Sequence, residues 1–396
     1  MFKTLDQMEC RGRRVIMRGD LNVPVRDGRV TDTTRLDRLA PTLKELSGKG
    51  ARIAVVSHFG RPKGQVVPEM SLRPIADALS VALGGLPVDF VEDCVGETAR
   101  AAINGLSDGG LVLLENLRFH VGEEANDPEF AKALAANGDL YVNDGFSVSH
   151  RAHASTAGIT RHIPAYAGRG MQAELEALTA ALETPRKPVA ALVGGAKVSS
   201  KLTVLGHLLD KVGSLIIGGG MANTFLFALG TDVGASLCEA DLANTALEIM
   251  ARADEVGCRV VLPSDVVIAS ALEEGVATET VPIAAVPSDR MILDVGPNSV
   301  AALNKHLTDC GTLLWNGPLG AFEVPPFNVG TNTVARRAAE LTAAGTLVSV
   351  AGGGDTVAAL AGAEAIDGFT YVSTAGGAFL EWLEGRELPG VTALTD

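Results

Sequence analysis

The stretch RVIMRGDLN (residues 14–22) shows the pattern that organises this chain: a short β-branched run ends directly in a polar segment. Similar runs recur along all 396 residues and alternate with helical stretches, which is typical of βαβ units and parallel sheets. A chain of this length is too long to fold around one ordinary hydrophobic core, and it suits two α/β domains. Strands are expected over residues 14–18, 52–56, 111–114, 139–142, 189–193, 213–217, 259–262, 312–315, 346–350 and 370–373.

We therefore predict an α/β fold with two Rossmann-like, three-layer α/β/α domains whose sheets are mainly parallel, joined by an interdomain helix and hinge. The first domain is expected over residues 1–170 and the second over residues 189–376. Residues 171–188 (MQAELEALTAALETPRKP) indicate one amphipathic linker helix ended by Pro185 and Pro188. The segment from about 377 to 396 is expected to pack back on the first domain.

Composition points to a globular protein of a reducing compartment. The five cysteines are odd in number and lack any C-x-x-C spacing, so neither a disulfide framework nor a zinc site is indicated. The start of the chain has no apolar core of signal-peptide length, and no apolar run approaches the roughly 18 residues of a membrane span. We expect a cytoplasmic protein that does not enter membranes.

Charge is distributed unevenly along the chain. The net charge of −14 argues against nucleic acid as a partner. Residues 1–170 are neutral, with 21 basic and 21 acidic side chains, and 16 of their cations are arginines. The planar guanidinium suits carboxylate and phosphate, so this half is a candidate for binding a small anion, although any single arginine could equally solvate a helix face.

Polar and cationic residues follow the strands expected in the first half. Because ligands of open α/β sheets bind beyond the carboxyl ends of the strands, these residues are candidates for a binding site. They would recognise a compact acid that carries phosphate and carboxylate groups. The candidates are Asp20-Leu21-Asn22, His58-Phe59-Gly60-Arg61, Glu115-Asn116-Leu117-Arg118, Asn143-Asp144 and His150-Arg151-Ala152-His153.

Glycine-rich segments follow the strands expected in the second half. Glycine also closes turns and helices, so each segment alone is weak evidence for a binding site. Five such segments, each after a different strand, indicate loops whose backbone N–H groups approach a polyphosphate. No G-x-x-x-x-G-K-[ST] or strand-bound G-x-G-x-x-G occurs, which counts against P-loop enzymes and dinucleotide dehydrogenases. The segments are Gly194–Lys197, Gly218–Gly220, Asn316-Gly317, Gly352–Thr356 and Thr374–Gly377.

Three charged residues of the second half are candidates for nucleotide contact. Lys197 and Lys201 are four apart, so they are expected on one face of a helix's first turns, where an anion would offset their conflict with the helix dipole. Asp355 follows three glycines, and it is either an N-cap residue or a ligand of Mg²⁺ at the mouth of a phosphate-binding helix. No serine or cysteine has the setting of a covalent nucleophile.

Ordered motifs run through nearly the whole chain: RGDLNVP (18–24), TRL (34–36), SHFGRP (57–62), LLENLRF (113–119), NDGF (143–146), HRAHAS (150–155), GGAKVSSK (194–201), GGGMA (218–222), WNGPLGAFE (315–323), GGGDT (352–356), STAGG (373–377) and LEGRELPGV (383–391). Taken together they closely resemble the phosphoglycerate kinase family. Departures are mild: Ser200 stands where the family usually has Asp, Ala375 replaces a Gly and Phe59 the usual Leu. Ile292 occupies a position where many members offer a Gly, so it is left out of the expected site.

The resemblance implies reversible phosphoryl transfer between 1,3-bisphosphoglycerate with ADP and 3-phosphoglycerate with ATP, using Mg²⁺, in a cytoplasmic, hinge-bending monomer. The acid is expected on the first domain and the nucleotide on the second. Residues implied for the acid are Asp20, Leu21, Asn22, Arg35, His58, Phe59, Gly60, Arg61, Arg118 and Arg151. Residues implied for the nucleotide are Lys197, Lys201, Asn316, Glu323, Gly353, Gly354, Asp355 and Thr356, with Glu323 towards the ribose and Asp355 towards Mg²⁺.

For catalysis, the residues expected to clamp the transferred group are Arg35, Lys197 and the backbone near Gly354 and Gly377. Two rival functions stay open at this point. Another acid kinase, acting on acetate or carbamate, would share the nucleotide half but would need fewer cations for its substrate. A non-enzymatic two-lobed binding protein would need no glycine-rich nucleotide loops.

Overall fold

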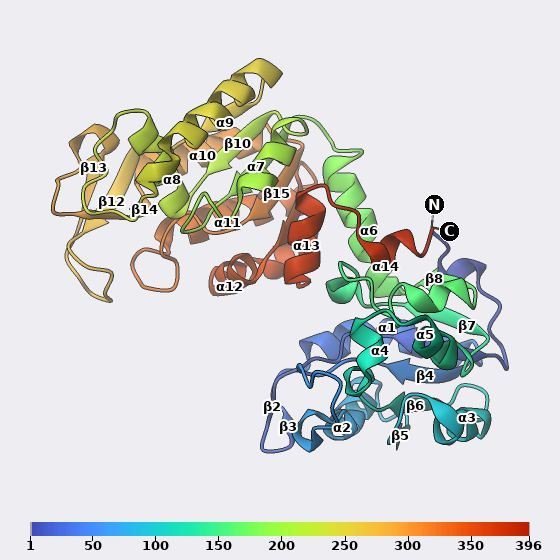
Figure 1. Ribbon diagram of the computed structural model, residues 1–396. Helices are drawn as coiled ribbons and strands as arrows, with labels where there is room; N and C mark the ends of the chain where they lie inside the picture. Colours follow the sequence, from blue (N-terminus) through green and yellow to red (C-terminus); the bar gives the residue numbers. More distant parts are fainter. Residues whose placement is uncertain (1, 396) are drawn as a thin grey trace. The chain divides into compact units, whose positions relative to one another are not determined.

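In a computed structural model, which describes residues 2–395, the chain divides into two compact units (Figure 1). The first unit comprises the chain up to Leu175 together with the segment that starts at Glu387, and the second comprises Glu176–Arg386. The chain therefore passes between the units twice, inside helix α6 (Arg169–Leu182) and after Arg386.

The first unit contains a six-stranded sheet in which every neighbouring pair is parallel. In sheet order its strands are β5 (Val88–Val91), β6 (Leu111–Leu114), β4 (Arg52–Val56), β1 (Arg14–Arg18), β7 (Leu140–Asn143) and β8 (Ala165–Ala167). Its helices are α1 (Thr34–Gly48), α2 (Arg73–Ala82), α3 (Gly96–Asn104), α4 (Val121–Glu124), α5 (Pro128–Ala135), the start of α6 and α14 (Pro389–Thr392).

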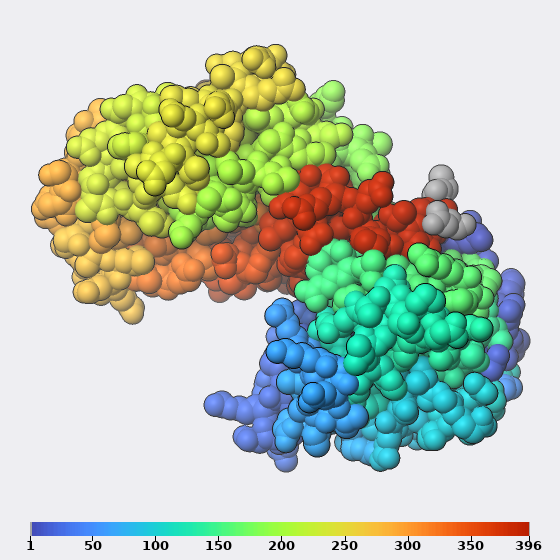
Figure 2. Space-filling view, viewed as in Figure 1, coloured from blue at the N-terminus to red at the C-terminus, as the bar shows by residue number. Residues whose placement is uncertain are grey.

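Helices cover both faces of this sheet because successive strand residues point to opposite sides. Val15 and Met17 of β1 belong to a core that includes the buried side chains of α1 and α2. Ile16, between them, belongs to a second core with residues of α3 and α5. A short hairpin of β2 (Val25–Arg26) and β3 (Arg29–Val30) projects from the surface of this unit, where it is dark blue in Figure 2.

The second unit repeats this architecture. Its six-stranded parallel sheet has the order β11 (Arg259–Val261), β10 (Ser214–Ile217), β9 (Val189–Val193), β15 (Thr312–Asn316), β16 (Val348–Gly352) and β17 (Tyr371–Ser373). One face packs on α10 (Pro297–Thr308), α11 (Val329–Ala343) and α12 (Gly354–Gly362), and the other is contacted by α7 (Leu202–Leu209) and α13 (Gly376–Leu383). The prediction of α/β units with mainly parallel sheets is confirmed.

A three-stranded antiparallel sheet in the second unit was not expected from the sequence. Its order is β13 (Thr278–Pro282), β12 (Asp265–Ala269) and β14 (Met291–Val295), and it lies near α8 (Gly219–Ala228) and α10. Strands β13 and β14 are partly exposed, so they lack the continuous apolar runs by which the central strands were recognised, whereas β12 is mostly buried and its run VVIA (266–269) was overlooked. Helix α9 (Ala243–Val256) completes the unit. The edge strands β5 and β8 were missed for the same reason, being short and only partly buried.

The linker helix is displaced from the expected residues 171–188, because it begins at Arg169. Helix α6 ends at Leu182, before Pro185, because the N–H groups of Glu183 and Thr184 both turn back to the carbonyl of Thr179. The chain also returns to the first unit later than about residue 377. Helix α13 stays in the second unit because Phe379 packs so closely on β16 that a Cβ on Gly352 would lie 2.6 Å from its ring. Within residues 2–395 no helix is long and apolar enough to cross a membrane.

The loops after β9 and β15 meet through their backbones in the second unit. A Cβ on Gly194 would lie 1.9 Å from the carbonyl oxygen of Pro318, and one on Gly317 would lie 2.1 Å from the carbonyl oxygen of Gly194. Real Cβ atoms do not approach backbone this closely, and the backbone has no rotamer by which to move away. Only glycine allows this contact.

We predict that Gly194→Ala lowers the free energy of unfolding of the second unit by about 1–3 kcal/mol, as an overpacked site does. Gly206→Ala is the matched control, because a Cβ there meets no atom within 4 Å and Gly206 lies inside α7. That control should gain about 0.5–1 kcal/mol. Calorimetric unfolding measures both, and a Gly194→Ala protein that unfolds at or above the wild-type temperature would contradict the steric argument.

Candidate functional site

Both parallel sheets have a point where the direction of strand addition reverses. In the first unit β4 and β7 lie on opposite sides of β1, and in the second unit β10 and β15 lie on opposite sides of β9. The connections after the two neighbouring strands therefore leave in opposite directions, and open α/β sheets bind ligands in the crevice at that point. One candidate site per unit follows.

Asp20 lies in the loop after β1. Its carboxylate accepts hydrogen bonds from the Asn22 N–H (3.1 Å), from the Ser147 hydroxyl and from the guanidinium of Arg35 on the first turn of α1. Burial alone would raise the pKa of Asp20, but the charge of Arg35 and the hydrogen bonds from Ser147 and Asn22 lower it. Asp20 is therefore ionised at neutral pH and holds Arg35 at the crevice.

His58 follows β4 and is buried, with 6% of its surface exposed. Arg18 Nη2 lies 3.1 Å from His58 Nδ1, and because arginine can only donate, Nδ1 accepts and the ring proton is on Nε2. Burial and the positive charges of Arg18, Arg118 and Arg35 lower the pKa of His58 well below its ordinary value. The ring is neutral at pH 7 and can donate one hydrogen bond from Nε2.

Arg118, in the loop after β6, is 4% exposed. Its Nη1 donates to the carbonyl of Gly60 (2.8 Å), its Nε lies 3.2 Å from Glu124 Oε1, and burial lowers its pKa. Gly60 in turn donates its N–H to the side-chain oxygen of Asn22 (3.0 Å). These bonds tie the loops after β1, β4 and β6 into one surface.

The remaining candidates of this unit differ in exposure. Arg61 is exposed and has no hydrogen-bond or ion-pair partner within residues 2–395. The Arg151 Nε donates to His150 Nε2 (3.1 Å). Leu21 is fully buried in the core, and its N–H donates to the Ser57 hydroxyl, so its side chain is not available to a ligand. Both backbone groups of Phe59 bond the side-chain amide of Asn116, which leaves only its partly buried ring.

The cations of this unit lie close enough to perturb one another. The pKa of His153 is lowered to about 4 by burial and then by Arg118, Arg18, Arg151 and His150. Like charges gathered on one surface repel, so the arrangement is favourable only with compensating negative charge. Asp20 and Glu124 supply part of that charge from the protein, and an anionic ligand would supply more.

In the second unit, Lys201 and Asn316 join the loops after β9 and β15. The Lys201 ammonium donates to the Asn316 side-chain oxygen, and the Asn316 amide donates to the carbonyl of Gly352 (2.7 Å). Burial lowers the pKa of Lys201 to about 8, while nearby Asp355 acts to raise it. Through the hydrogen bond to Gly352, this chain of contacts also reaches the loop after β16.

Lys197 does not lie in the first turns of a helix with Lys201, contrary to the sequence-based expectation. Helix α7 begins at Leu202, with Lys201 as its N-cap residue. The preceding residues form turns because Ser199 donates from its N–H and hydroxyl to Glu239 and the Ser200 hydroxyl donates to the Lys197 carbonyl (2.8 Å). Lys197 is exposed, and its ammonium makes no hydrogen bond or ion pair within the described part of the chain, although its charge acts on Glu239.

Helix α12 begins directly after β16. Gly353 is its N-cap residue with φ of +101°, a conformation that glycine adopts and other residues rarely do. The Thr356 hydroxyl accepts from the Gly317 N–H (2.7 Å), whereas Gly354 and Asp355 are exposed. The first turn of a helix has unpaired N–H groups, so this end can bind an anion. Gly353 has no side chain that could cap the helix. Asp355 lies inside the helix, so it is not the N-cap residue.

A cavity of about 340 Å³ opens beside these loops, entirely within the second unit. Gly195, Gly219 and Gly220 contribute backbone to its wall, and Glu323 and Asp355 lie at its lining. Asp294 is a third acidic residue of the lining, and burial raises its pKa to about 7 although two backbone N–H groups donate to it. The apolar part of the wall is formed by Leu237, Leu272, Met291, Ile292, Leu293 and Phe322.

Gly377 is the second residue of α13 and is exposed. It does not line this cavity. Its N–H belongs to the unpaired first turn of that helix, as the N–H of Gly354 does for α12. Asn316 and Thr356 also lie outside the cavity lining. Both are buried and make hydrogen bonds to the loops described above.

Known proteins match this chain over nearly its whole length. The family model described as "Phosphoglycerate kinase" matches residues 5–386. The chain belongs to the phosphoglycerate kinase family. A phosphoglycerate kinase of Ruegeria sp. (strain TM1040) is 59% identical over 99% of this chain and 99% of that protein. One of Rhizobium meliloti (strain 1021) is 60% identical over 99% of this chain and 98% of its own length.

Solved structures agree with this family membership. The structure of phosphoglycerate kinase from Coxiella burnetii has a TM-score of 0.93 and 42% identity, and the match covers 100% of this chain and 99% of that one. The phosphoglycerate kinase from Pyrococcus horikoshii OT3 has a TM-score of 0.82 at 29% identity, covering 100% and 98%. The family suggested by the ordered motifs is thus confirmed.

Two groups of residues escaped sequence reasoning. Part of the apolar wall, including Ile292, comes from strand β14 of the unexpected antiparallel sheet, which carries no glycine motif. The buried network of Arg18, Glu123 and Ser155 was also missed. The Arg18 Nε donates to the Ser155 hydroxyl (3.0 Å), which donates to Glu123 Oε1 (2.6 Å). Glu123 resembles an ordinary acid on the exposed face of a helix. The only sign of a buried polar network in the sequence was Arg18, an arginine at the end of an apolar strand.

We predict that Glu123→Gln lowers the free energy of unfolding of the first unit by about 1–3 kcal/mol, because the two carboxyl oxygens accept from the Ser155 N–H and hydroxyl and the amide nitrogen that replaces one of them cannot accept. Glu129→Gln is the control, because Glu129 is exposed on α5 and should change stability by less than about 0.5 kcal/mol. Thermal unfolding at pH 7 measures both. Equal midpoints for the two variants would show that the hydrogen bonds from Ser155 to Glu123 do not stabilise the unit.

Proposed function

We propose that this chain catalyses reversible phosphoryl transfer between 1,3-bisphosphoglycerate with ADP and 3-phosphoglycerate with ATP. The single observation that carries the proposal is the pair of strand-end sites with opposite chemical character, one in each unit. The first is surrounded by guanidinium groups, and the second combines glycine loops with an apolar cavity. Membership in the phosphoglycerate kinase family supports the same reaction.

The acid is proposed to bind to the first unit. Phosphate and carboxylate at opposite ends of a three-carbon chain need several cations at fixed spacing, and guanidinium groups bind both bidentately. Arg35, Arg61, Arg118 and Arg151 are proposed to supply these contacts. Asp20, Asn22 and His58 are proposed to contact the substrate hydroxyl and carboxylate, with His58 donating from Nε2.

The nucleotide is proposed to bind to the second unit. The apolar wall and the glycine backbones suit a planar base, and Glu323 at the cavity lining suits a ribose hydroxyl. Lys197, Lys201 and the first turn of α12 suit the phosphates. Lys201 is already hydrogen-bonded to Asn316, so Asn316 would fix the ammonium in place for the phosphate oxygens.

Asp355 is the residue proposed to hold Mg²⁺ together with the nucleotide phosphates. The fit rests on its exposed carboxylate at the first turn of α12 and at the cavity lining, because Mg²⁺ prefers one or two carboxylates plus phosphate oxygens. When bound, the ion would neutralise charge on the phosphates.

The chemistry needs charge stabilisation and positioning from the protein's own residues. The acceptor carboxylate is deprotonated at pH 7, so no general base is required, which agrees with the neutral state of His58 and His153. Arg35, Lys197 and the N–H groups of Gly354 and Gly377 are proposed to surround the transferred group. Since the two substrates bind different units, we propose that hinge closure brings them together and excludes water.

We also propose a cytoplasmic monomer that acts in glycolysis and gluconeogenesis and binds neither nucleic acid nor membranes. A rival acid kinase is distinguished by substrate. A coupled assay for ADP formation with 3-phosphoglycerate, acetate or buffer alone should respond only to 3-phosphoglycerate. Activity with acetate alone would contradict the proposal.

We predict that Arg35→Ala lowers kcat by at least about 100-fold, because it removes a charge that stabilises the transition state, with little change in the KM for nucleotide. Lys44→Ala, exposed on the same helix α1, is the control and should leave kcat unchanged. Steady-state kinetics of both variants, with unfolding temperatures measured in parallel, test this role. A fully active Arg35→Ala enzyme would remove Arg35 from the clamp.

We predict that Asp355→Asn weakens the Mg²⁺-dependent part of ADP binding by about tenfold or more and leaves metal-free ADP binding nearly unchanged, because only the carboxylate is lost. Calorimetric titration with and without Mg²⁺ separates the two parts. Asp367→Asn, which removes an acid from outside the cavity lining, is the control. An unchanged Mg²⁺ dependence in Asp355→Asn would assign the ion to other groups.

A further inference from the structure

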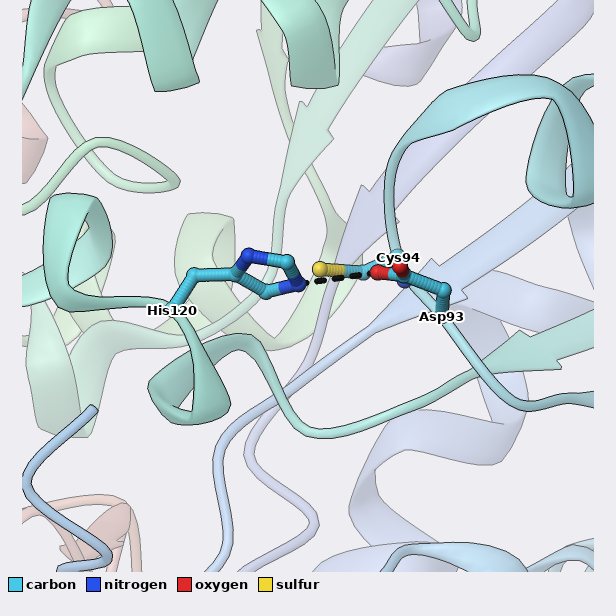
Figure 3. Close-up of side chains that lie close together, drawn as sticks. All are labelled: Asp93, Cys94 and His120. Carbon is cyan, nitrogen blue, oxygen red and sulfur yellow. Dashed lines mark hydrogen bonds and ion pairs between the residues drawn. The ribbon is translucent and has the colours of Figure 1, made fainter. Parts of the chain in front are cut away.

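Three metal-ligating side chains meet in the first unit, and none of them belongs to the proposed phosphoryl-transfer site. Asp93 and Cys94 lie in the connection between β5 and α3, and His120 precedes α4. Figure 3 shows the three side chains pointing toward one another. One potential ligand atom of each lies within 4.8 Å of the other two, and His120 Nε2 is 2.8 Å from Asp93 Oδ1.

We propose that Asp93, Cys94 and His120 form a binding site for a borderline divalent transition-metal ion of the Zn²⁺ or Co²⁺ type. Sulfur, imidazole nitrogen and carboxylate oxygen are the donors that such ions select, whereas Mg²⁺ and Ca²⁺ avoid thiolate. Three protein donors leave one tetrahedral position for water. The proposal does not depend on the phosphoryl-transfer function.

The geometry requires only small movements. With metal–nitrogen and metal–oxygen distances of about 2.0–2.2 Å and a metal–sulfur distance of about 2.3 Å, ligand atoms on one ion lie roughly 3.3–3.6 Å apart. The atoms that are now up to 4.8 Å apart must therefore close by about 1 Å, and the Asp93–His120 pair must open slightly.

The surroundings hold the donors in place. The His120 ring stacks on Phe130 with centroids 5.0 Å apart, and the Asn137 amide donates to the Cys94 carbonyl (2.9 Å). Asp93 Oδ1 accepts from the N–H groups of Cys94 and Val95 as well as from His120. Asp93 Oδ2 has no hydrogen-bond partner within residues 2–395, so this oxygen is open to an ion.

An ion can approach from the solvent side of this cluster. The side chains of His120 and Asp93 are 33% and 46% exposed, whereas Cys94 is fully buried behind them. Binding exchanges protons for the ion: the thiol proton of Cys94 leaves to solvent, and the Nε2 proton of His120 is replaced by one on Nδ1. Burial raises the pKa of the Cys94 thiol, so this exchange costs part of the binding free energy.

Titration of the full-length, reduced protein with Co²⁺, without substrates, tests the site. Cobalt bound to thiolate gives a near-ultraviolet charge-transfer band, which reports coordination of sulfur directly and needs no catalytic turnover. We expect the band to saturate at one ion per chain and to disappear on addition of Zn²⁺. Cys94→Ser should abolish it, and His120→Ala and Asp93→Asn should each weaken Co²⁺ binding by at least about tenfold.

Two variants serve as matched controls. Cys238→Ser removes a more exposed thiol of the second unit, and His162→Ala removes an exposed histidine of the first unit. Both should keep the band. Circular dichroism of Cys94→Ser confirms that it folds, and Asp93→Asn gives an independent result if it does not. No band in the wild-type protein, or a band that survives in Cys94→Ser, would overturn the proposal.

Discussion

In each unit the parallel sheet grows in both directions from its first strand, β1 or β9, and every functional feature depends on that constraint. Helices cover both faces of such a sheet, so the carboxyl end where neighbouring connections diverge is left uncovered. The sequence places Asp20, His58 and Arg118 after strands of the first sheet, and Gly194, Asn316 and Gly353 after strands of the second. Topology thus gathers residues that are up to 98 positions apart in the first unit (Asp20 to Arg118) and up to 159 in the second (Gly194 to Gly353).

The same topology serves two chemistries because the units solve opposite physical problems. The first must keep several like charges on one surface, and it does so with the buried network of Arg18, Ser155 and Glu123 and with the ionised Asp20. The second exposes backbone at its cavity through Gly195, Gly219 and Gly220, and Gly194 and Gly317 allow its loops to touch. Arginine side chains characterise the first site, and the absence of side chains at glycines shapes the second.

The central strands and the positions of the polar loops could be predicted from the sequence, because buried parallel strands read as continuous apolar runs such as VAALV (189–193). The antiparallel strand β13 could not, since its mostly exposed residues resemble a loop. The turn before α7 could not either, because it depends on Glu239, forty residues away from Ser199. The network of Arg18 and Glu123 could not be predicted, because only the tertiary structure brings the two residues together through Ser155.

The division of binding between the units is tested most directly by amide hydrogen exchange with one ligand at a time. 3-Phosphoglycerate alone should protect backbone near residues 20–22, 58–61 and 118 of the first unit, and ADP with Mg²⁺ alone should protect residues 194–201, 316–323 and 353–356 of the second. Primary protection of the second unit by 3-phosphoglycerate, or of the first by the nucleotide, would contradict the assignment of the acid to the arginine surface and of the nucleotide to the glycine loops.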